Sequence, residues 1–272
     1  QQNTALTLTR VEYKNSEGTL QSAVTSFTTA ATNEANVVKS YPTVSHVDLT
    51  NSNIVNGQSI DLYKFSVTAS SAGSVALKQL KFPITFTDVD ADTIEIHSWK
   101  LYKNNADVST SSSTVAIQKQ DGTSIESTDG AGDATFTGGS DDTTVVVIWD
   151  TDEEVIAAGE TATYILRATP TGFDSDGDTG EEDYFTIYLA GDATDNGSDL
   201  CLEDSGSGDI WELDAEVSSA CTAASSSNSA YNFVWSDLSG SSHAGGTETG
   251  SADWANGYLV KNLDLSGETW AK

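Results

Sequence analysis

Hydrophobic and polar residues alternate with a period of two along much of the chain. Residues 60–67 (IDLYKFSV) show this pattern, which buries one face of a β-strand. Val, Ile, Thr, Tyr and Trp dominate such runs, and Gly, Ser, Asp and Asn dominate the gaps between them. No stretch of 12 or more residues has helical spacing with capping residues. Strands are therefore predicted at residues 60–67, 75–86, 94–102, 144–149, 161–168, 184–189, 231–235 and 258–263.

The predicted strand at residues 75–86 contains two irregularities. The phase of its alternation slips between Leu77 and Leu80, which predicts a β-bulge. Pro83 cannot donate a hydrogen bond to a sheet, so it indicates either an edge position or a second irregularity.

About nine or ten strands without long helices predict an all-β sandwich or barrel. Residues 146–172 favour the sandwich. There a predicted strand ends at Trp149 and is followed by an acidic stretch and a turn at Gly159 and Glu160. A second predicted strand follows this turn, and its Tyr164 is a candidate core residue. This pattern resembles that of bacterial immunoglobulin-like surface domains. The predicted fold is an Ig-like β-sandwich with an N-terminal strand arm and long acidic loop insertions.

Composition divides the chain into two predicted parts. A strand-like segment at residues 4–13 is separated from the later strands by a stretch rich in Ala, Thr and Ser, at residues 20–38. We therefore expect an N-terminal arm at residues 1–43 and an enlarged sandwich at residues 44–272. Residues 171–183, 191–208 and 236–253 are too polar to build a core. They are interpreted as loop insertions on the sandwich, in a region that spans residues 171–256.

The charge of the chain is strongly acidic and uneven. Asp and Glu number 41 against 12 Lys and Arg, a formal net charge of −29. Residues 104–272 hold 32 of these acids and four of the basic residues. A phosphate backbone must be met by basic side chains, so this balance excludes non-specific nucleic-acid binding. It also argues against docking on an anionic membrane, and no apolar run is long enough for a membrane helix.

The sequence also indicates an exported protein. It contains no Met, so Gln1 is not a translational start: either the chain was trimmed or a leader was removed, and the second suggests secretion. In an exported chain, Cys201 and Cys221 favour a single disulfide, which stabilises by about 3 kcal/mol in the chain-entropy model. Two unpaired thiols in a cytosolic protein are the alternative. Asn196 begins the Asn-Gly-Ser sequence of an N-glycosylation site, so a glycoprotein is expected.

Several segments of the chain resemble a family of large surface proteins. The segments are residues 232–237 (NFVWSD), 241–243 (SSH), 253–260 (DWANGYLV), 101–104 (LYKN) and 157–161 (AAGET). Together they resemble β-rich proteins predicted on the surface of uncultivated, small-genome bacteria. The resemblance implies a surface-exposed, Ig-like β-protein. It supplies no activity and no site residues.

A calcium site is predicted in the acidic loop at residues 174–183. Asp174, Asp176 and Asp178 occupy positions 1, 3 and 5 of this loop, and Glu182 follows. Hard cations such as Ca²⁺ prefer this density of oxygen ligands. The loop departs from an EF-hand because Phe185 stands where the bidentate Glu belongs. Further acidic clusters occur at residues 88–92, 150–154 and 192–195, and solvated acidic loops are the alternative for all of them.

Catalysis is not expected. His46, His97 and His243 lie in no recognisable catalytic motif, and with 41 acids no pair of carboxylates is informative. Most of the six Trp residues belong to strand patterns and are expected in the core. Trp211 and Trp254 lie in polar loops and are the exposed candidates for stacking on sugars.

The predicted function is that of a structural subunit in an extracellular filament or pilus-like assembly. The N-terminal strand, with Leu6, Leu8, Val11 and Tyr13, would complete the sandwich of a neighbouring copy, or alternatively would pair with its own sheet. A contact of the first kind is head-to-tail and grows into a homopolymer. A calcium-dependent carbohydrate- or surface-binding module and an S-layer lattice protein are the alternatives.

Overall fold

The computed structural model of the protein is built from β-strands, and no helix occurs among the residues that it describes. The chain divides into two compact units, Gln1–Val38 and Lys39–Lys272. The described residues contain no helix that is long and apolar enough to cross a membrane. They are 2–4, 35–89, 93–110, 114–120, 123–125, 136–137, 144–149, 152–175, 181–192, 201–203, 210–212, 233–240, 243, 253–258 and 260–272.

The first unit contains two short strands, β1 (Gln2–Thr4) and β2 (Ala35–Val37). They pair antiparallel, with Gln2 opposite Val37 and Thr4 opposite Ala35. The two ends of this segment are thus joined to each other. The proposed donor residues lie outside the described part of the chain; they are Leu6, Leu8, Val11 and Tyr13.

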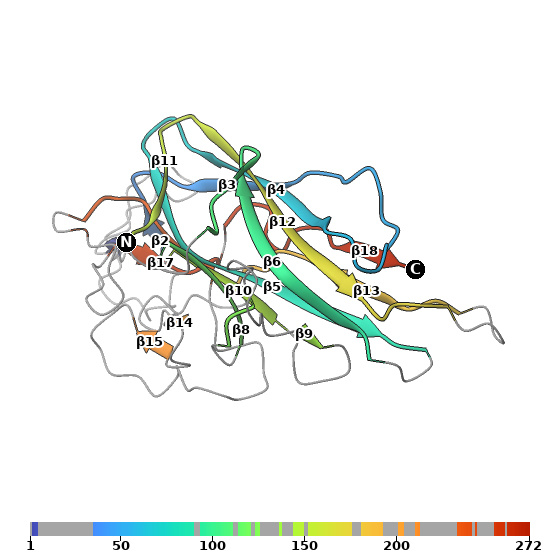
Figure 1. Cartoon of the computed structure of the whole chain (residues 1–272). Helices are drawn as coiled ribbons and strands as arrows, with labels where there is room; N and C mark the ends of the chain where they lie inside the picture. The colour runs from blue at the N-terminus through green and yellow to red at the C-terminus, as the bar shows by residue number, and fades with distance from the viewer. Residues whose placement is uncertain are drawn as a thin grey trace, which may run out of the picture. The chain divides into compact units, whose positions relative to one another are not determined.

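The second unit is a β-sandwich of two antiparallel sheets, which confirms the predicted all-β class (Figure 1). The first sheet has the order β17-β16-β5-β10-β8, with β11 and β13 also paired to β5 and β18 paired to β13. Its strands are β5 (Val75–Thr87), β8 (Val115–Lys119), β10 (Thr144–Trp149), β11 (Glu154–Ile156), β13 (Tyr184–Ile187), β16 (Val234–Ser236), β17 (Trp254–Ala255) and β18 (Glu268–Ala271).

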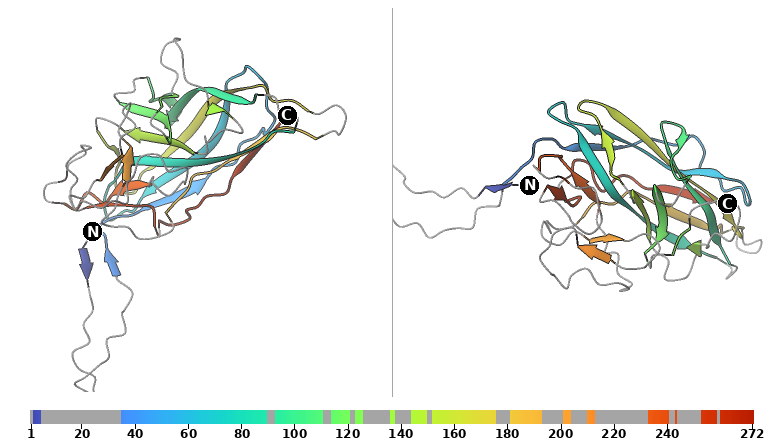
Figure 2. Two further views of the ribbon diagram at one scale, coloured as in Figure 1. Left: turned by 90° about the horizontal axis from the view of Figure 1, so that it is seen from below. Right: turned by 60° about the vertical axis from the view of Figure 1, so that its left-hand side comes forward.

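The second sheet has the order β3-β4-β12-β6-β7, with β9 paired to β6. Its strands are β3 (Pro42–His46), β4 (Ile60–Ala69), β6 (Glu95–Lys103), β7 (Ala106–Asp107), β9 (Phe136–Thr137) and β12 (Thr161–Thr171). Two further short strands, β14 (Cys201–Glu203) and β15 (Ile210–Glu212), pair only with each other. Figure 2 shows the two layers of the sandwich from two further sides.

Aromatic side chains fill the space between the two sheets. Tyr164 on β12 is fully buried, stacks on Phe65 at 5.2 Å between ring centroids and meets Trp149 edge-on at 6.1 Å. The prediction that Tyr164 is the core residue after the turn at Gly159 is therefore confirmed. Trp99, Trp149, Trp235, Trp254 and Trp270 are all at most 5% exposed. Trp254 is thus a core residue, and the expectation that it is exposed for sugar binding is wrong.

Strand β5 is the centre of the first sheet. Ten consecutive residues, from Val75 to Ile84, are buried, so both faces of the strand are covered. Its pairing with β16 shifts register: Val234 lies opposite Gln79 but Trp235 lies opposite Leu77, which leaves Lys78 as the extra residue of the predicted bulge. Pro83 is not at an edge. It lies opposite Thr144 as the last residue of β5 to pair with β10, and its carbonyl oxygen accepts from the NH of Tyr188 at 3.4 Å, so the edge alternative is wrong. The pairing of β5 with β10 shows no register shift at Pro83.

The outer face of this sheet also carries buried apolar side chains. Ala76, Val146 and Ile148 form a buried apolar cluster with Val234 and Trp254, which come from the C-terminal part of the chain. Beside this cluster, the buried Lys81 and Asp192 form an ion pair of 2.7 Å. The second oxygen of Asp192 accepts hydrogen bonds from the backbone NH groups of Phe233 (3.1 Å) and Gly257 (2.7 Å). One buried carboxylate thus holds two C-terminal segments against the sheet.

The predicted strand at residues 258–263 does not form. Its described residues make turns, with the NH of Val260 bonded to Gly257 O and that of Leu263 bonded to Val260 O. Asn262 has a φ of +77°, in the left-handed region that ends regular pairing. A single parallel bridge between Lys261 and Thr43 remains, and it covers the outer edge of β3.

The first residue of β3 and the last residue of β18 lie beside opposite ends of β5. Pro42, at the start of β3, lies opposite Ala69, just before the turn that leads into β5. Ala271, at the end of β18, lies opposite Tyr184, which in turn lies opposite Thr87 at the end of β5. A strand rises about 3.3 Å per residue, so the two ends of β5, beside which Pro42 and Ala271 lie, are separated by roughly 40 Å along its 13 residues.

The buried tyrosines predict a loss of stability in alkali. Burial, and the charge and hydrogen bond of Glu154, raise the pKa of Tyr164, while burial and the charge of Glu268 raise the pKa of Tyr63. A tyrosine whose pKa is higher in the folded than in the unfolded chain contributes its full stabilisation below about pH 10, the pKa of an unfolded tyrosine. This contribution to the free energy of unfolding is lost as the pH rises further. The free energy of unfolding should therefore fall with increasing slope above about pH 10.

The Tyr164→Phe variant tests this expectation in denaturant titrations at neutral and alkaline pH. It should lower stability at neutral pH, because Tyr164 donates to Glu154, yet show a shallower alkaline decline than the wild type. Tyr41→Phe, at a side chain that is 50% exposed, is the control and should keep the wild-type decline. Equal alkaline slopes for the wild type and Tyr164→Phe would refute the interpretation.

Candidate functional site

Two acidic segments far apart in the sequence meet where β5 ends and β13 begins. We call this region, with Asp88, Asp174, Glu181, Glu182 and Asp183, the acidic end of the sandwich. Asp183 joins the two segments: its Oδ1 accepts from the NH of Val89 at 2.9 Å, and its Oδ2 accepts from the NH of Asp174 at 2.8 Å. The Asp183 side chain is fully buried. Sequence analysis missed this role, because in the sequence Asp183 is one more acid in an acidic run.

The predicted calcium loop begins and ends in a hairpin. An antiparallel bridge joins Ser175 to Glu182, and the NH of Asp183 donates to Asp174 O at 3.0 Å. The structure thus brings Asp174 and Glu182 to the base of the same loop, while Asp176 and Asp178 lie outside the described residues. Among the residues that are described, no group of three His, Cys, Asp or Glu side chains is arranged to hold a metal. Calcium binding stays a prediction.

Phe185 explains why this loop does not follow the EF-hand pattern. Its side chain is fully buried and contacts Phe86 at 5.8 Å and Phe173 at 5.6 Å between ring centroids. The position where an EF-hand has its bidentate Glu is therefore part of the hydrophobic core. Any side chain that coordinates calcium in this region would have to belong to a residue before β13.

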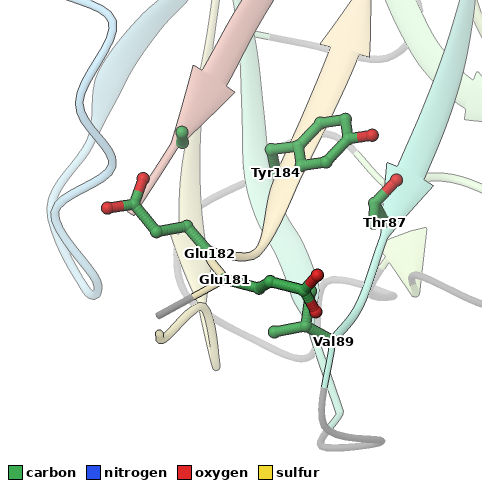
Figure 3. Close-up of a pocket in the computed structure, with 6 residues that line it drawn as sticks. Thr87, Val89, Glu181, Glu182 and Tyr184 are labelled. Carbon is green, nitrogen blue, oxygen red and sulfur yellow. The ribbon is translucent and has the colours of Figure 1, made fainter. Parts of the chain in front are cut away.

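An open hollow of about 460 Å³ lies at the acidic end. Its lining comes from three strands, from the residues just after β5 and from the segment before β13: Thr87, Val89, Glu181, Glu182, Tyr184 and Ala271. Thr87, Tyr184 and Ala271 lie opposite one another on β5, β13 and β18 and form one row across the sheet. Figure 3 shows the Tyr184 hydroxyl on the Thr87 side of the hollow, with the Glu181 and Glu182 carboxylates pointing to opposite sides.

This row belongs to the outer face of the sheet. The neighbouring row, Phe86, Phe185 and Trp270, points into the core, because successive side chains of a strand alternate between faces. Tyr184 is 40% exposed, one of five large hydrophobic side chains exposed in the described part of the chain. The hollow therefore combines an exposed aromatic ring, a threonine hydroxyl and two carboxylates.

Each of the three histidines lies within hydrogen-bonding distance of a carboxylate or a hydroxyl group. Nε2 of His46 lies 2.9 Å from Glu268 Oε1, a contact that joins β3 of one sheet to β18 of the other. Nδ1 of His243 lies 2.9 Å from Asp253 Oδ2, and the Asp253 oxygen also accepts from Ser236 Oγ at 3.0 Å. His97 contacts the hydroxyl of the adjacent Ser98 at 2.9 Å. Each histidine thus has a partner that accounts for it structurally.

The remaining predicted sites lie wholly or partly outside the described residues. Cys201 is the first residue of β14, but Cys221, its predicted disulfide partner, is not described, and neither is Asn196 of the glycosylation sequence. The side chain of Trp211, on β15, is also outside the described part. The disulfide and the glycosylation site therefore stay predictions.

Comparisons with known proteins do not identify a family. No family model matches the chain, and no curated protein matches it. Among solved structures, one described as "AvmM Catalyzes Macrocyclization in Alchivemycin A Biosynthesis" covers 58% of this chain and 75% of its own, at 13% identity and a TM-score of 0.23. A likeness at this level carries no argument about fold or activity.

Asp183 is expected to hold the acidic end together. In Asp183→Asn the amide nitrogen cannot accept, so either Val89 or Asp174 loses its acceptor in a buried site. Leaving one buried donor unsatisfied costs about 1–3 kcal/mol. Urea denaturation should show this loss of stability.

The control is Asp48→Asn, because the Asp48 side chain is 98% exposed, and it should leave the urea midpoint unchanged. If both variants unfold at the same urea concentration as the wild type, Asp183 does not hold the two segments together.

Proposed function

We propose that the protein is a structural subunit of an extracellular filament or pilus-like assembly, in which the N-terminal arm of one copy pairs with the sandwich of the next. The observation that supports this proposal is that residues 1–38 form a compact unit of their own, distinct from the sandwich of residues 39–272. A strand that is not part of its own sandwich can be added to the sheet of another copy.

A head-to-tail contact uses two different surfaces of the subunit. Such heterologous contacts generate open filaments when the rotation between subunits does not close a ring. Residues 1–38 form a unit of their own, and the described strand β1 pairs with β2 and not with either sheet of the sandwich. The arm therefore does not supply a strand to its own sandwich through these residues, which supports a role in contacts with another copy.

The charge distribution favours assembly in salt. Residues 1–38 hold three acidic and two basic residues, so residues 39–272 hold the other 38 acidic and 10 basic residues. Sandwiches of such high negative charge repel one another when they are packed closely. Salt screens this repulsion, since the Debye length falls to about 10 Å at 0.1 M ionic strength. The proposed location on the cell surface, which the resemblance described above implies, is an environment of this kind.

Removal of residues 1–13 tests the role of the arm. The deletion removes β1 and the predicted donor residues but leaves every strand of the sandwich intact. The truncated protein should be folded and monomeric, as measured by sedimentation velocity and electron microscopy of negatively stained samples. A truncated protein that still forms filaments would exclude strand addition by the arm.

Calcium and salt should promote polymerisation. Polymers of the full chain are expected to be more resistant to dissociation in millimolar Ca²⁺ or moderate salt than in a chelator at low salt, because cations reduce the repulsion between acidic sandwiches. Light scattering across these conditions measures the effect. Sodium chloride at matched ionic strength separates screening from specific binding. If chelator and Ca²⁺ give the same polymer stability at matched ionic strength, calcium plays no part.

A further inference from the structure

We propose that the hollow at the acidic end, together with the adjoining outer face of β5, β13 and β18, binds a neutral polysaccharide. This inference does not depend on filament formation. Of the two aromatic candidates that the sequence indicated for sugar binding, Trp254 is buried and the side chain of Trp211 lies outside the described residues. Tyr184 is an exposed aromatic residue that lines a hollow.

Threonine hydroxyl groups are regularly arranged on this face of the sheet. Thr85, Thr186 and Thr269 lie opposite one another on three adjacent strands, in the row next to Tyr184 on the same face. The hydroxyls of Thr186 and Thr269 are 3.1 Å apart and exposed. A hydroxyl is both a donor and an acceptor, so each can still bond to a ligand. Regularly spaced hydroxyls on a flat sheet suit a chain of sugars, which presents repeated hydroxyl groups.

The aromatic ring of Tyr184 is accessible to a ligand. Tyr184 is 40% exposed although it lies in the middle of three paired strands, with Thr87 and Ala271 as its neighbours. Both neighbouring side chains are small, so they leave the ring accessible within the hollow. Aromatic rings supply a large apolar surface with a polar tip, which suits the apolar face and the hydroxyl rim of a sugar ring. A volume of about 460 Å³ lies within the range of small-molecule sites.

The charge of the hollow selects the class of polysaccharide. Glu181 and Glu182 line the hollow, and none of its six described lining residues is Lys or Arg. Carboxylates accept hydrogen bonds from sugar hydroxyls but repel uronic acids, sialic acids and sulfated sugars. The residues present therefore fit a neutral polysaccharide and disfavour an anionic one.

Native affinity electrophoresis of the full chain tests the proposal. Gels contain one neutral polysaccharide each, from a panel of β-glucan, α-glucan, mannan and xylan, and polygalacturonate is the anionic comparison. At least one neutral polysaccharide should retard the protein, while polygalacturonate should not. Tyr184→Ala should weaken the retardation by roughly tenfold in apparent affinity, the equivalent of one lost aromatic contact.

Matched variants separate binding from folding. Tyr41→Ala removes a tyrosine that is 50% exposed at the opposite end of β5, and it should bind as the wild type does. Tyr184→Phe keeps the ring and should retain most of the affinity. Near-ultraviolet circular dichroism establishes whether each variant is folded.

Three results would overturn the inference: no retardation by any neutral polysaccharide, equal retardation of wild type and Tyr184→Ala, or stronger retardation by polygalacturonate. If Tyr184→Ala abolishes polymerisation and no polysaccharide binds, the hollow is a contact between copies of this chain. Loss of filaments on arm deletion with unchanged polysaccharide binding would support both proposals separately. Absence of filaments under all conditions would refute only the proposed function.

Discussion

The double-sided burial of β5 is the constraint on which the rest of the sandwich depends. Antiparallel sheets commonly bury one face and leave the other in water. Here ten successive residues of β5 are buried, and the strand pairs with β10, β11, β13 and β16 along its length. On the outer side, part of this burial comes from a cluster within the sheet itself, in which Val234 on β16 and Trp254 on β17 pack with apolar residues of β5 and β10.

Buried carboxylates hold irregular segments of the chain beside the strands. Asp192 pairs with Lys81 and also accepts from two backbone NH groups, and Asp183 accepts from two others at the acidic end. Asp253 accepts from Ser236 and from the NH of Gly240. Irregular segments have backbone donors that no ladder satisfies, and a buried donor without a partner is costly. Part of the strong acidity of the chain therefore has an internal role, as a supply of acceptors for loops.

The two ends of the sandwich differ, and both proposals follow from this difference. The arm joins at the end where β5 begins, whereas the end where β5 finishes carries two acidic segments and the hollow around Tyr184. A subunit with unlike ends can form a directional filament, and a polysaccharide site at one end would be repeated once for each subunit. Repetition of weak sites along a polymer raises avidity without any new contact, provided that several sites reach the same ligand. Assembly and carbohydrate binding are therefore compatible in one molecule.

The alternation of residue types determined the features that depend on a single strand. It predicted most of the strands, the burial of Tyr164 after the turn at Gly159 and the bulge between Leu77 and Leu80. These features are local, because the side-chain period of a strand records directly which of its faces is buried. The same alternation at residues 258–263 was misleading, since an alternating segment becomes a strand only when another strand lies beside it.

Tertiary structure decided everything that depends on contacts between distant segments. It made β5 the central strand, so that Pro83 lies inside the sheet, and it buried Trp254 against Val146 and Ile148. It distinguished Asp183, an internal acceptor, from exposed acids such as Asp48, and it placed Tyr184 between Thr87 and Ala271 in an open hollow. A buried carboxylate and a solvated carboxylate are the same residue type in the sequence. The register and packing of strands that are far apart in the sequence determine which of the two environments each carboxylate occupies.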